Sequence, residues 1–216
     1  MATIHHTTLI PTKLELLAGW LPARPWYRAT GRPPELARAG GFRLDDPDGE
    51  VGIEFMVVTD GRYGDDVTSY LVPMTYRGSA LADDDGGLIG TTEHGVLGRR
   101  WVYDGTRDAV LVTQLAALVQ GKAQAQAQSE SDTPDLTVLT RPPATTALTP
   151  SAFTVTGDGP EGTDLTLTDG AAGALAIRVH RVLSRAAGKV ADEGSVTARW
   201  RLPDGTQVRG VVATSG

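Results

Sequence analysis

Four side chains able to perform acid–base or charge-binding chemistry gather within eight residues of the chain: Glu93, His94, Arg99 and Arg100. A carboxylate, an imidazole and two guanidinium groups are sufficient for proton transfer or for holding an anion. The same groups can instead pair with one another and serve only a turn or an interface. We therefore treat them as candidate contacts with a ligand or partner, and assign no catalytic residue.

A second set of cationic side chains falls on strands near the end of the chain. Alternating apolar residues over 196–202 predict a strand with one polar face, and Pro203-Asp204-Gly205 predicts a hairpin to 206–212. The candidate anion-binding residues on polar strand faces are Arg178, Arg199, Arg201 and Arg209. Guanidinium groups bind phosphate or carboxylate through paired hydrogen bonds. A solvated sheet face and a contact with an acidic protein are the alternatives.

The composition excludes several kinds of active site. The 216 residues include no cysteine, so the chain forms no disulfide, thiolate nucleophile or cysteine-bound metal site. It has no phosphate-binding loop of the form G-x-x-x-x-G-K-[ST] and no G-x-S-x-G nucleophile elbow. His94-Gly95 continues with Val96, where a kinase catalytic loop carries aspartate. The sequence therefore favours a protein without enzymatic activity and predicts no cofactor.

No metal site is predicted either. The acidic loops 45–50 and 83–87 lack the alternating ligands and distal glutamate of a calcium-binding loop. His5 and His6 are adjacent, but the other two histidines lie in different regions of the chain. Turn formation explains the acidic loops equally well.

Charge and hydropathy argue against two classes of partner. The net charge of −6 disfavours general nucleic-acid binding, although a local contact through Arg199, Arg201 and Arg209 stays an alternative. No apolar run approaches the roughly 20 residues of a membrane helix, and no basic leader precedes the first apolar residues. We therefore expect a cytoplasmic protein with no nucleic-acid or membrane partner.

The elements that must position these residues begin with a short helix. Thr12 and Glu15 form a capping box, apolar residues follow on one face, and Pro22 ends the helix. The aromatic residues Trp26 and Tyr27 come next, and we expect them to pack in the core. Alternation over 51–59 and 67–77 then predicts an antiparallel hairpin, with Pro73 at an edge or bulge.

A second helix is predicted just after the first candidate cluster. Asp108 can cap it, Leu111, Leu115 and Leu118 form its buried face, and Gly121 ends it. The polar, glutamine- and alanine-rich segment that follows is typical of a frayed helix end or a linker. After residue 134 the pattern is mostly strand and turn.

These patterns predict an α+β protein with mainly antiparallel, curved sheets and a few flanking helices. We expect a first domain at 1–122, a linker at 123–134 and a β-rich domain or subdomain at 135–216. A chain of this length accommodates either one large core or two small ones.

Several short segments resemble a known family. Trp20-Leu21-Pro22, Trp26-Tyr27, Gly31-Arg32, Tyr70-Leu71-Val72-Pro73 and Val102-Tyr103-Asp104 stand in the order found in the N-terminal cap domain of actinobacterial maltokinases. The similarity covers about residues 7–122, and the first segment departs from the family pattern at Pro25 and at Ala29-Thr30. The first domain is accordingly expected to be a maltokinase-cap-like domain of a bacterial protein.

The resemblance implies a curved antiparallel sheet that, in the family, accompanies a kinase core phosphorylating maltose or related sugars. Residues 175–183 resemble the kinase strand with the ATP-pairing lysine, but Arg178 takes its place, so the catalytic core is expected to be missing. We expect a non-catalytic binding or regulatory protein of α-glucan, maltose or trehalose metabolism. Its candidate partners are a protein of sugar metabolism and a small sugar or sugar phosphate. The alternative is a degenerate sugar kinase or sugar-modifying enzyme.

Overall fold

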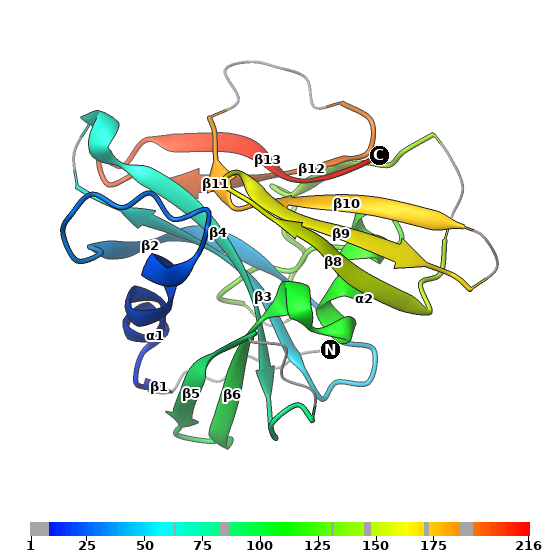
Figure 1. Cartoon of the computed structure of the whole chain (residues 1–216), viewed down its shortest axis with the longest axis horizontal. Helices are drawn as coiled ribbons and strands as arrows, with labels where there is room; N and C mark the ends of the chain where they lie inside the picture. The colour runs from blue at the N-terminus through cyan, green and yellow to red at the C-terminus, as the bar shows by residue number, and fades with distance from the viewer. Residues whose placement is uncertain are drawn as a thin grey trace.

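The computed structural model describes residues 9–62, 64–82, 87–130, 132–144, 148–170, 173–185 and 192–216. Antiparallel strands dominate it (Figure 1). The strands are β1 (Leu9–Ile10), β2 (Leu36–Leu44), β3 (Gly52–Asp60), β4 (Thr68–Arg77), β5 (Leu88–His94), β6 (Gly98–Asp104), β7 (Leu139–Arg141), β8 (Ala152–Asp158), β9 (Gly162–Thr168), β10 (Ala174–His180), β11 (Val182–Leu183), β12 (Ser195–Arg201) and β13 (Gln207–Ser215). The helices are α1 (Lys13–Trp20) and α2 (Ala109–Val119), with short 3₁₀ turns η1 (Leu21–Ala23), η2 (Gly64–Asp66) and η3 (Gly105–Arg107).

The balance of elements corrects the α+β prediction. Strands account for 46% of the structure and helices for 14%, so the fold is closer to all-β, while its antiparallel character is confirmed. The difference comes chiefly from β2, which the local patterns did not predict, whereas β8 and β9 fall in the region expected to be mostly strand and turn. Besides its sequence neighbour β3, β2 pairs with β12, a strand distant in sequence.

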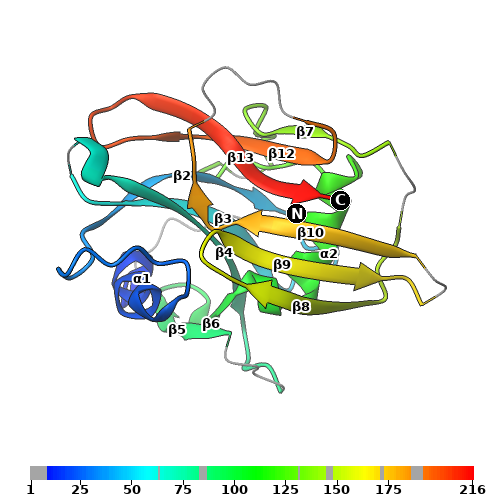
Figure 2. The same cartoon turned by 45° about the horizontal axis from the view of Figure 1, so that its top comes forward.

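The strands form one continuous sheet. Its order is β1-β5-β6-β4-β3-β2-β12-β13-β10-β9-β8, with β7 added to β12 and β11 added to β4. Figure 2 shows α2 behind the β10–β9–β8 part of the sheet, and α1 on the side of β5 and β6. Because β1 and β8 end this path, the described strands form an open sheet rather than a closed barrel.

The two faces of β3 pack against different helices. Ile53, Phe55 and Val57 face the core that contains α2, and Phe55 stacks on Phe42 of β2 with ring centroids 4.6 Å apart. Met56 and Val58, on the opposite face, belong to the second core with α1. The alternation predicted for this strand is therefore confirmed, and both faces are buried because each has its own helix.

Local capping signals determine where both helices begin. The capping box is present: Thr12 Oγ1 accepts a hydrogen bond from the Glu15 amide, and a Glu15 carboxylate oxygen accepts one from the Thr12 amide at 2.7 Å. Asp108 caps α2 by accepting from the Val110 amide at 3.0 Å. Gly121, with a φ of 70°, follows α2 in the left-handed conformation.

Pro73 and the aromatic residues lie where the sequence predicts. β4 pairs with β11 at Ser69 and Tyr70 and with β6 from Met74 onward, and Pro73 falls between these two stretches. The amide hydrogen that proline lacks therefore falls where β4 pairs with neither β11 nor β6. Trp26 is 1% exposed, and its ring centroid lies 5.9 Å from that of Tyr70.

The last hairpin confirms the predicted strands with one change. Val196, Ala198 and Trp200 of β12 face the core, and Trp200 Nε1 donates to Ser69 Oγ at 3.0 Å. Thr197 lies on the strand face that the alternation over 196–202 predicts to be polar, yet it is only 4% exposed. Its Oγ1 accepts a hydrogen bond from Arg209 Nη1, and β7 pairs beside it.

The division at 1–122, 123–134 and 135–216 stays a prediction, but the three ranges are closely joined. Strands of the first and last ranges share the sheet through β2 and β12. Within 123–134, Gln126 exchanges backbone hydrogen bonds with Arg43, both at 2.9 Å. Gln128 donates to Glu54 Oε1 at 2.7 Å, so the segment expected to be a linker lies against β2 and β3.

Candidate functional site

The β5–β6 hairpin brings the first four candidate residues together. Glu93 and Arg99 face each other across the two strands, with Arg99 Nε 2.8 Å from Glu93 Oε1. Their side chains are 58% and 63% exposed, so the ion pair is strongly screened by water. It aligns the two strands rather than presenting a free charge.

His94 and Arg100 stabilise the turn of the same hairpin. His94 Nδ1 accepts hydrogen bonds from the amides of Val96 and Leu97 at 3.2 and 3.0 Å. Arg100 Nη2 donates to the Leu97 carbonyl oxygen at 2.7 Å. One ring nitrogen of His94 is thus occupied by backbone donors, which disfavours that nitrogen as a general base.

Apolar side chains surround these polar groups. Val96 and Leu97 at the turn are 63% and 45% exposed, and Ile10 of the adjoining strand β1 is 70% exposed. Ile10 pairs with Glu93 in the β1–β5 ladder. Figure 1 shows that the β5–β6 hairpin extends from one end of the molecule, away from α2. The hairpin therefore presents exposed apolar groups around paired polar ones.

The second set of candidates divides into two groups. Arg178 on β10 makes a two-point ion pair with Asp164 on β9, with Nε–Oδ1 and Nη2–Oδ2 distances of 2.6 and 2.9 Å. This contact lowers the pKa of Asp164. The charge of Arg178 is therefore compensated within the sheet.

Arg199 and Arg209 instead face each other directly across β12 and β13. Arg201 lies two residues farther along β12, opposite Gln207. Burial first, and the charge of Arg199 second, lower the pKa of Arg209. The structure thus groups three of the four predicted anion-binding residues and separates Arg178 from them.

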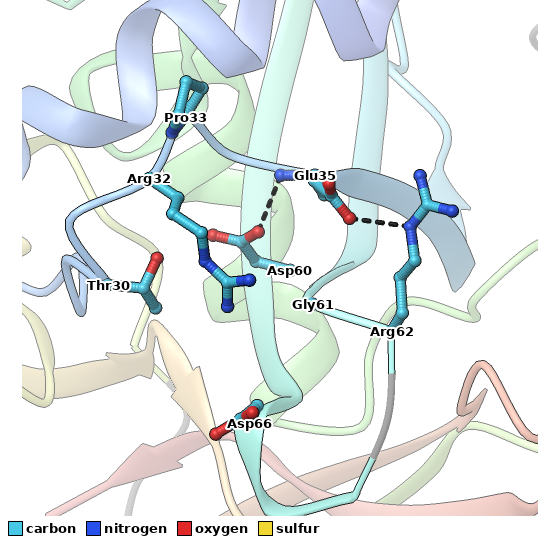
Figure 3. A pocket seen from close by; sticks show the side chains of 8 residues that line it. All are labelled: Thr30, Arg32, Pro33, Glu35, Asp60, Gly61, Arg62 and Asp66. Atoms are coloured by element: carbon cyan, nitrogen blue, oxygen red, sulfur yellow. Dashed lines mark hydrogen bonds and ion pairs between the residues drawn. The ribbon is translucent and has the colours of Figure 1, made fainter.

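A pocket of about 460 Å³ lies between the segment before β2 and the β3–β4 connection. Figure 3 shows its lining by Thr30, Arg32, Pro33, Glu35, Asp60, Gly61, Arg62 and Asp66. Small-molecule sites have volumes of this order. The lining carries both charge signs, which suits a polar ligand better than an apolar one.

Asp60 forms the buried wall of this pocket. Its carboxylate is held by the Tyr27 hydroxyl at 2.9 Å and by the Glu35 amide at 2.8 Å, and the residue is 7% exposed. Burial, followed by the hydrogen bond to Asp60 and its charge, raises the pKa of Tyr27 to about 12. Arg62 Nε lies 2.6 Å from Glu35 Oε2, whereas Arg32 has no ion-pair partner among the described residues.

Sequence patterns do not single out this pocket. Asp60, Gly61 and Arg62 fall in the connection between the two predicted strands, and Arg32 lies only in a family-like segment. The signal available was the charge density of residues 60–66, but charged turns are common on protein surfaces. Their convergence with residues 30–35 depends on the path of the chain after η1.

The described residues include no group of three or more histidine, aspartate or glutamate side chains placed to hold a metal ion. His5, His6 and residues 83–86, considered above, lie outside the described residues. Of the helices within the described ranges, none has the length and apolarity needed to cross a membrane.

The fold and these surfaces define a β-sheet protein with a protruding hairpin, a polar pocket and a basic strand pair. Residues 20–108 match the family model described as the maltokinase N-terminal cap domain. The predicted resemblance is confirmed over this range, which is narrower than the expected 7–122 and contains β2 to β6. No match was found among curated proteins.

The match includes the hairpin and the pocket but not the basic strand pair. It begins at Trp20 and ends at Asp108, the cap of α2. The helix α2 and the strands β7 to β13 lie outside the matched range. The matched range therefore contains residues of the first two surfaces and none of the third.

Proposed function

We propose that the chain is a non-catalytic cap-like module that binds an enzyme of maltose, trehalose or α-glucan metabolism through its β5–β6 hairpin. The family match over residues 20–108 supports the metabolic setting. The observation that carries the proposal is the exposure of Val96, Leu97 and Ile10 around the Glu93–Arg99 ion pair.

This combination suits a protein contact for a physical reason. Apolar side chains in the centre of an interface gain free energy when they leave water, and polar groups at its rim keep partial hydration. Val96 and Leu97 contribute little to the described core, because most of the Val96 surface and nearly half of the Leu97 surface are in water. Their burial against a partner would therefore add stability that the free chain lacks.

The hairpin contacts also support binding over catalysis. Glu93 is paired with Arg99, His94 Nδ1 accepts from two backbone amides, and Arg100 donates to a carbonyl within the turn. Each contact lies inside the hairpin and stiffens it. A rigid loop loses little conformational entropy on association, which favours affinity.

A co-purification experiment with matched variants tests the proposal. The wild-type chain is expected to retain an identified carbohydrate enzyme from native lysate, and Val96→Asp with Leu97→Asp to lose it. Leu136→Asp is the control, because Leu136 is also exposed, at 77%, but lies outside the hairpin. Equal recovery with the hairpin variant, or recovery of no carbohydrate enzyme, would refute the proposal.

A sugar-modifying or degenerate kinase activity is the second candidate, and the pocket at Asp60 is the observation that favours it. Its carboxylates and guanidinium groups can accept from and donate to sugar hydroxyls. A thermal-shift panel of maltose, trehalose, maltose phosphate and ATP with magnesium tests this candidate. A ligand at 100 times its dissociation constant should stabilise the chain by about 2.7 kcal/mol. Unchanged melting temperatures, or shifts that persist in Asp60→Asn, would exclude the pocket.

A further inference from the structure

We infer that Arg199, Arg209 and Arg201 form a binding site for a phosphate group, on the outer face of the β12–β13 hairpin. This site lies outside the residues matched by the family model. It shares no residue with the β5–β6 hairpin or with the pocket at Asp60.

The register of β12 and β13 places the three arginines on one face of the hairpin. Arg199 and Arg209 are direct cross-strand neighbours, and Arg201 pairs with Gln207 one step along the same face. Side chains directly opposite each other have Cβ atoms about 5 Å apart, and residues two apart on a strand are roughly 7 Å apart. The backbone positions of the three arginines are therefore close enough for their guanidinium groups to contact one bound anion.

Like charges at directly opposed positions destabilise a sheet. The structure offers little internal compensation: Arg209 Nη1 donates to the neutral Thr197 Oγ1 at 3.0 Å, and no ion pair of Arg199, Arg201 or Arg209 occurs among the described residues. Asp135 acts electrostatically on Arg209 and compensates part of its charge, but it forms no ion pair with Arg209 among the described residues. A bound anion would relieve this repulsion.

Arg178 shows the contrasting arrangement on the same sheet. It is 53% exposed and also lies on a strand, yet Asp164 faces it at 2.6 Å and compensates its charge. The sheet thus accommodates an acidic neighbour for one exposed arginine and places an arginine in that position beside Arg199. Arg199 and Arg209 therefore lack the acidic partner that Arg178 has in Asp164.

The geometry favours a phosphate monoester over a single carboxylate. A carboxylate carries one negative charge on two oxygens, so one bidentate guanidinium group compensates it, as Arg178 does for Asp164. A phosphate group has three terminal oxygens and close to two negative charges at neutral pH, so it can accept from two or three guanidinium groups at once. Arg199 and Arg209 would hold it from opposite strands, with Arg201 at its side.

Calorimetric titration of the full chain with inorganic phosphate, at constant ionic strength, tests the site. The wild type should bind saturably, and Arg199→Ala with Arg209→Ala should weaken binding at least about tenfold, since the variant loses the charge-assisted hydrogen bonds of two guanidinium groups. Arg178→Ala is the matched control and should bind as the wild type does.

Thermal unfolding gives a second measurement that separates binding from general salt effects. Phosphate stabilises many proteins by exclusion from their surface, and that effect does not saturate with a defined affinity. At ten times the dissociation constant, specific binding should favour the folded state about 11-fold, in the wild type and in Arg178→Ala only. The double variant should still unfold cooperatively in chloride, because its removed groups lie at the outer face.

Three outcomes would overturn the inference. The first is equal phosphate stabilisation of all three proteins, which identifies a solvent effect. The second is undiminished binding in the Arg199→Ala and Arg209→Ala double variant, which places phosphate elsewhere. The third is saturable binding of an acidic peptide without binding of phosphate, which identifies a protein-contact surface instead.

Discussion

Arg181 Nη2 lies 2.6 Å from Asp104 Oδ2, and this ion pair joins β6 to the residue between β10 and β11. The two side chains are 1% and 7% exposed. Arg181 also donates to Thr106 Oγ1 at 2.8 Å and to Thr163 Oγ1 at 2.8 Å, and its guanidinium carbon lies 5.1 Å from the Trp26 ring centroid. A single buried arginine therefore connects the cap-like region with the strands that follow it.

Removing one partner of this pair should be strongly destabilising. Arg181→Met leaves the Asp104 carboxylate buried without its cation, and we expect the free energy of unfolding to fall by about 3–5 kcal/mol. Urea unfolding measures the change. Arg178→Met removes an exposed ion pair and should cost about 0–1 kcal/mol. Similar losses in the two variants would contradict a special role for the buried pair.

The buried Glu54 network should make stability depend on acid pH. Burial alone raises the pKa of Glu54, but the charge of Lys13 and hydrogen bonds from Lys13, Tyr76 and Gln128 outweigh it, so the pKa is lowered from 4.5. The folded state thus binds this proton less readily than the unfolded state. The resulting stabilisation is complete above the unfolded pKa and is lost as the pH falls through the folded one.

Glu54→Gln tests this dependence. Its deficit in unfolding free energy relative to the wild type should be largest near neutral pH and should shrink as the pH falls below about 4.5. Glu93→Gln is the control for an exposed glutamate in a screened ion pair, and it should cost no more than about 1 kcal/mol at neutral pH. A pH-independent deficit in Glu54→Gln would show that packing, rather than charge, explains its effect.

Asp108 both caps α2 and forms an ion pair with Arg77, and two variants should separate the stability contributions of these contacts. Its carboxylate accepts from the Val110 amide at 3.0 Å and from Arg77 through two contacts of 2.6 Å. We expect Asp108→Ala to cost about 2–4 kcal/mol in urea unfolding. Asp108→Ser retains a capping oxygen and should recover about 1 kcal/mol. Equal stability of the two variants would contradict a capping contribution.

The two arginines that face each other across β12 and β13, Arg199 and Arg209, predict a stabilising substitution. Arg199→Glu places a carboxylate opposite Arg209, converting repulsion into attraction across β12 and β13. We expect the free energy of unfolding to rise by about 0.2–1 kcal/mol in low salt, and the gain to diminish at 1 M salt. Thermal unfolding at two salt concentrations measures it. A lower melting temperature in low salt would contradict the electrostatic argument.

Much of the local structure was predictable because its causes are local. Thr12 with Glu15, Asp108, and Pro203-Asp204-Gly205 each determine a helix start or turn through neighbouring atoms. The alternation of Ile53, Phe55 and Val57 likewise indicates a strand before any partner is known. The family resemblance also depended on short ordered segments, and the match over 20–108 confirms it.

The candidate sites were predictable only in part. Glu93 and Arg99 lie close in the sequence and share one hairpin, but their mutual pairing depends on the register of its strands. Arg178 was placed with Arg199 and Arg209, although Asp164 compensates it. Adding one residue to a strand exchanges its two faces, so charge pairing across strands cannot be derived from composition.

The sequence by itself determined the helix starts, the principal hairpins and the absence of cysteine chemistry. Only the tertiary structure decided that β2 pairs with β12, that Gln128 reaches Glu54, and that Arg181 meets Asp104 across 77 residues. The physical reason is that local signals act through atoms a few residues apart. Long-range contacts form instead where burial and backbone pairing of the whole sheet offset the entropy of closing long loops.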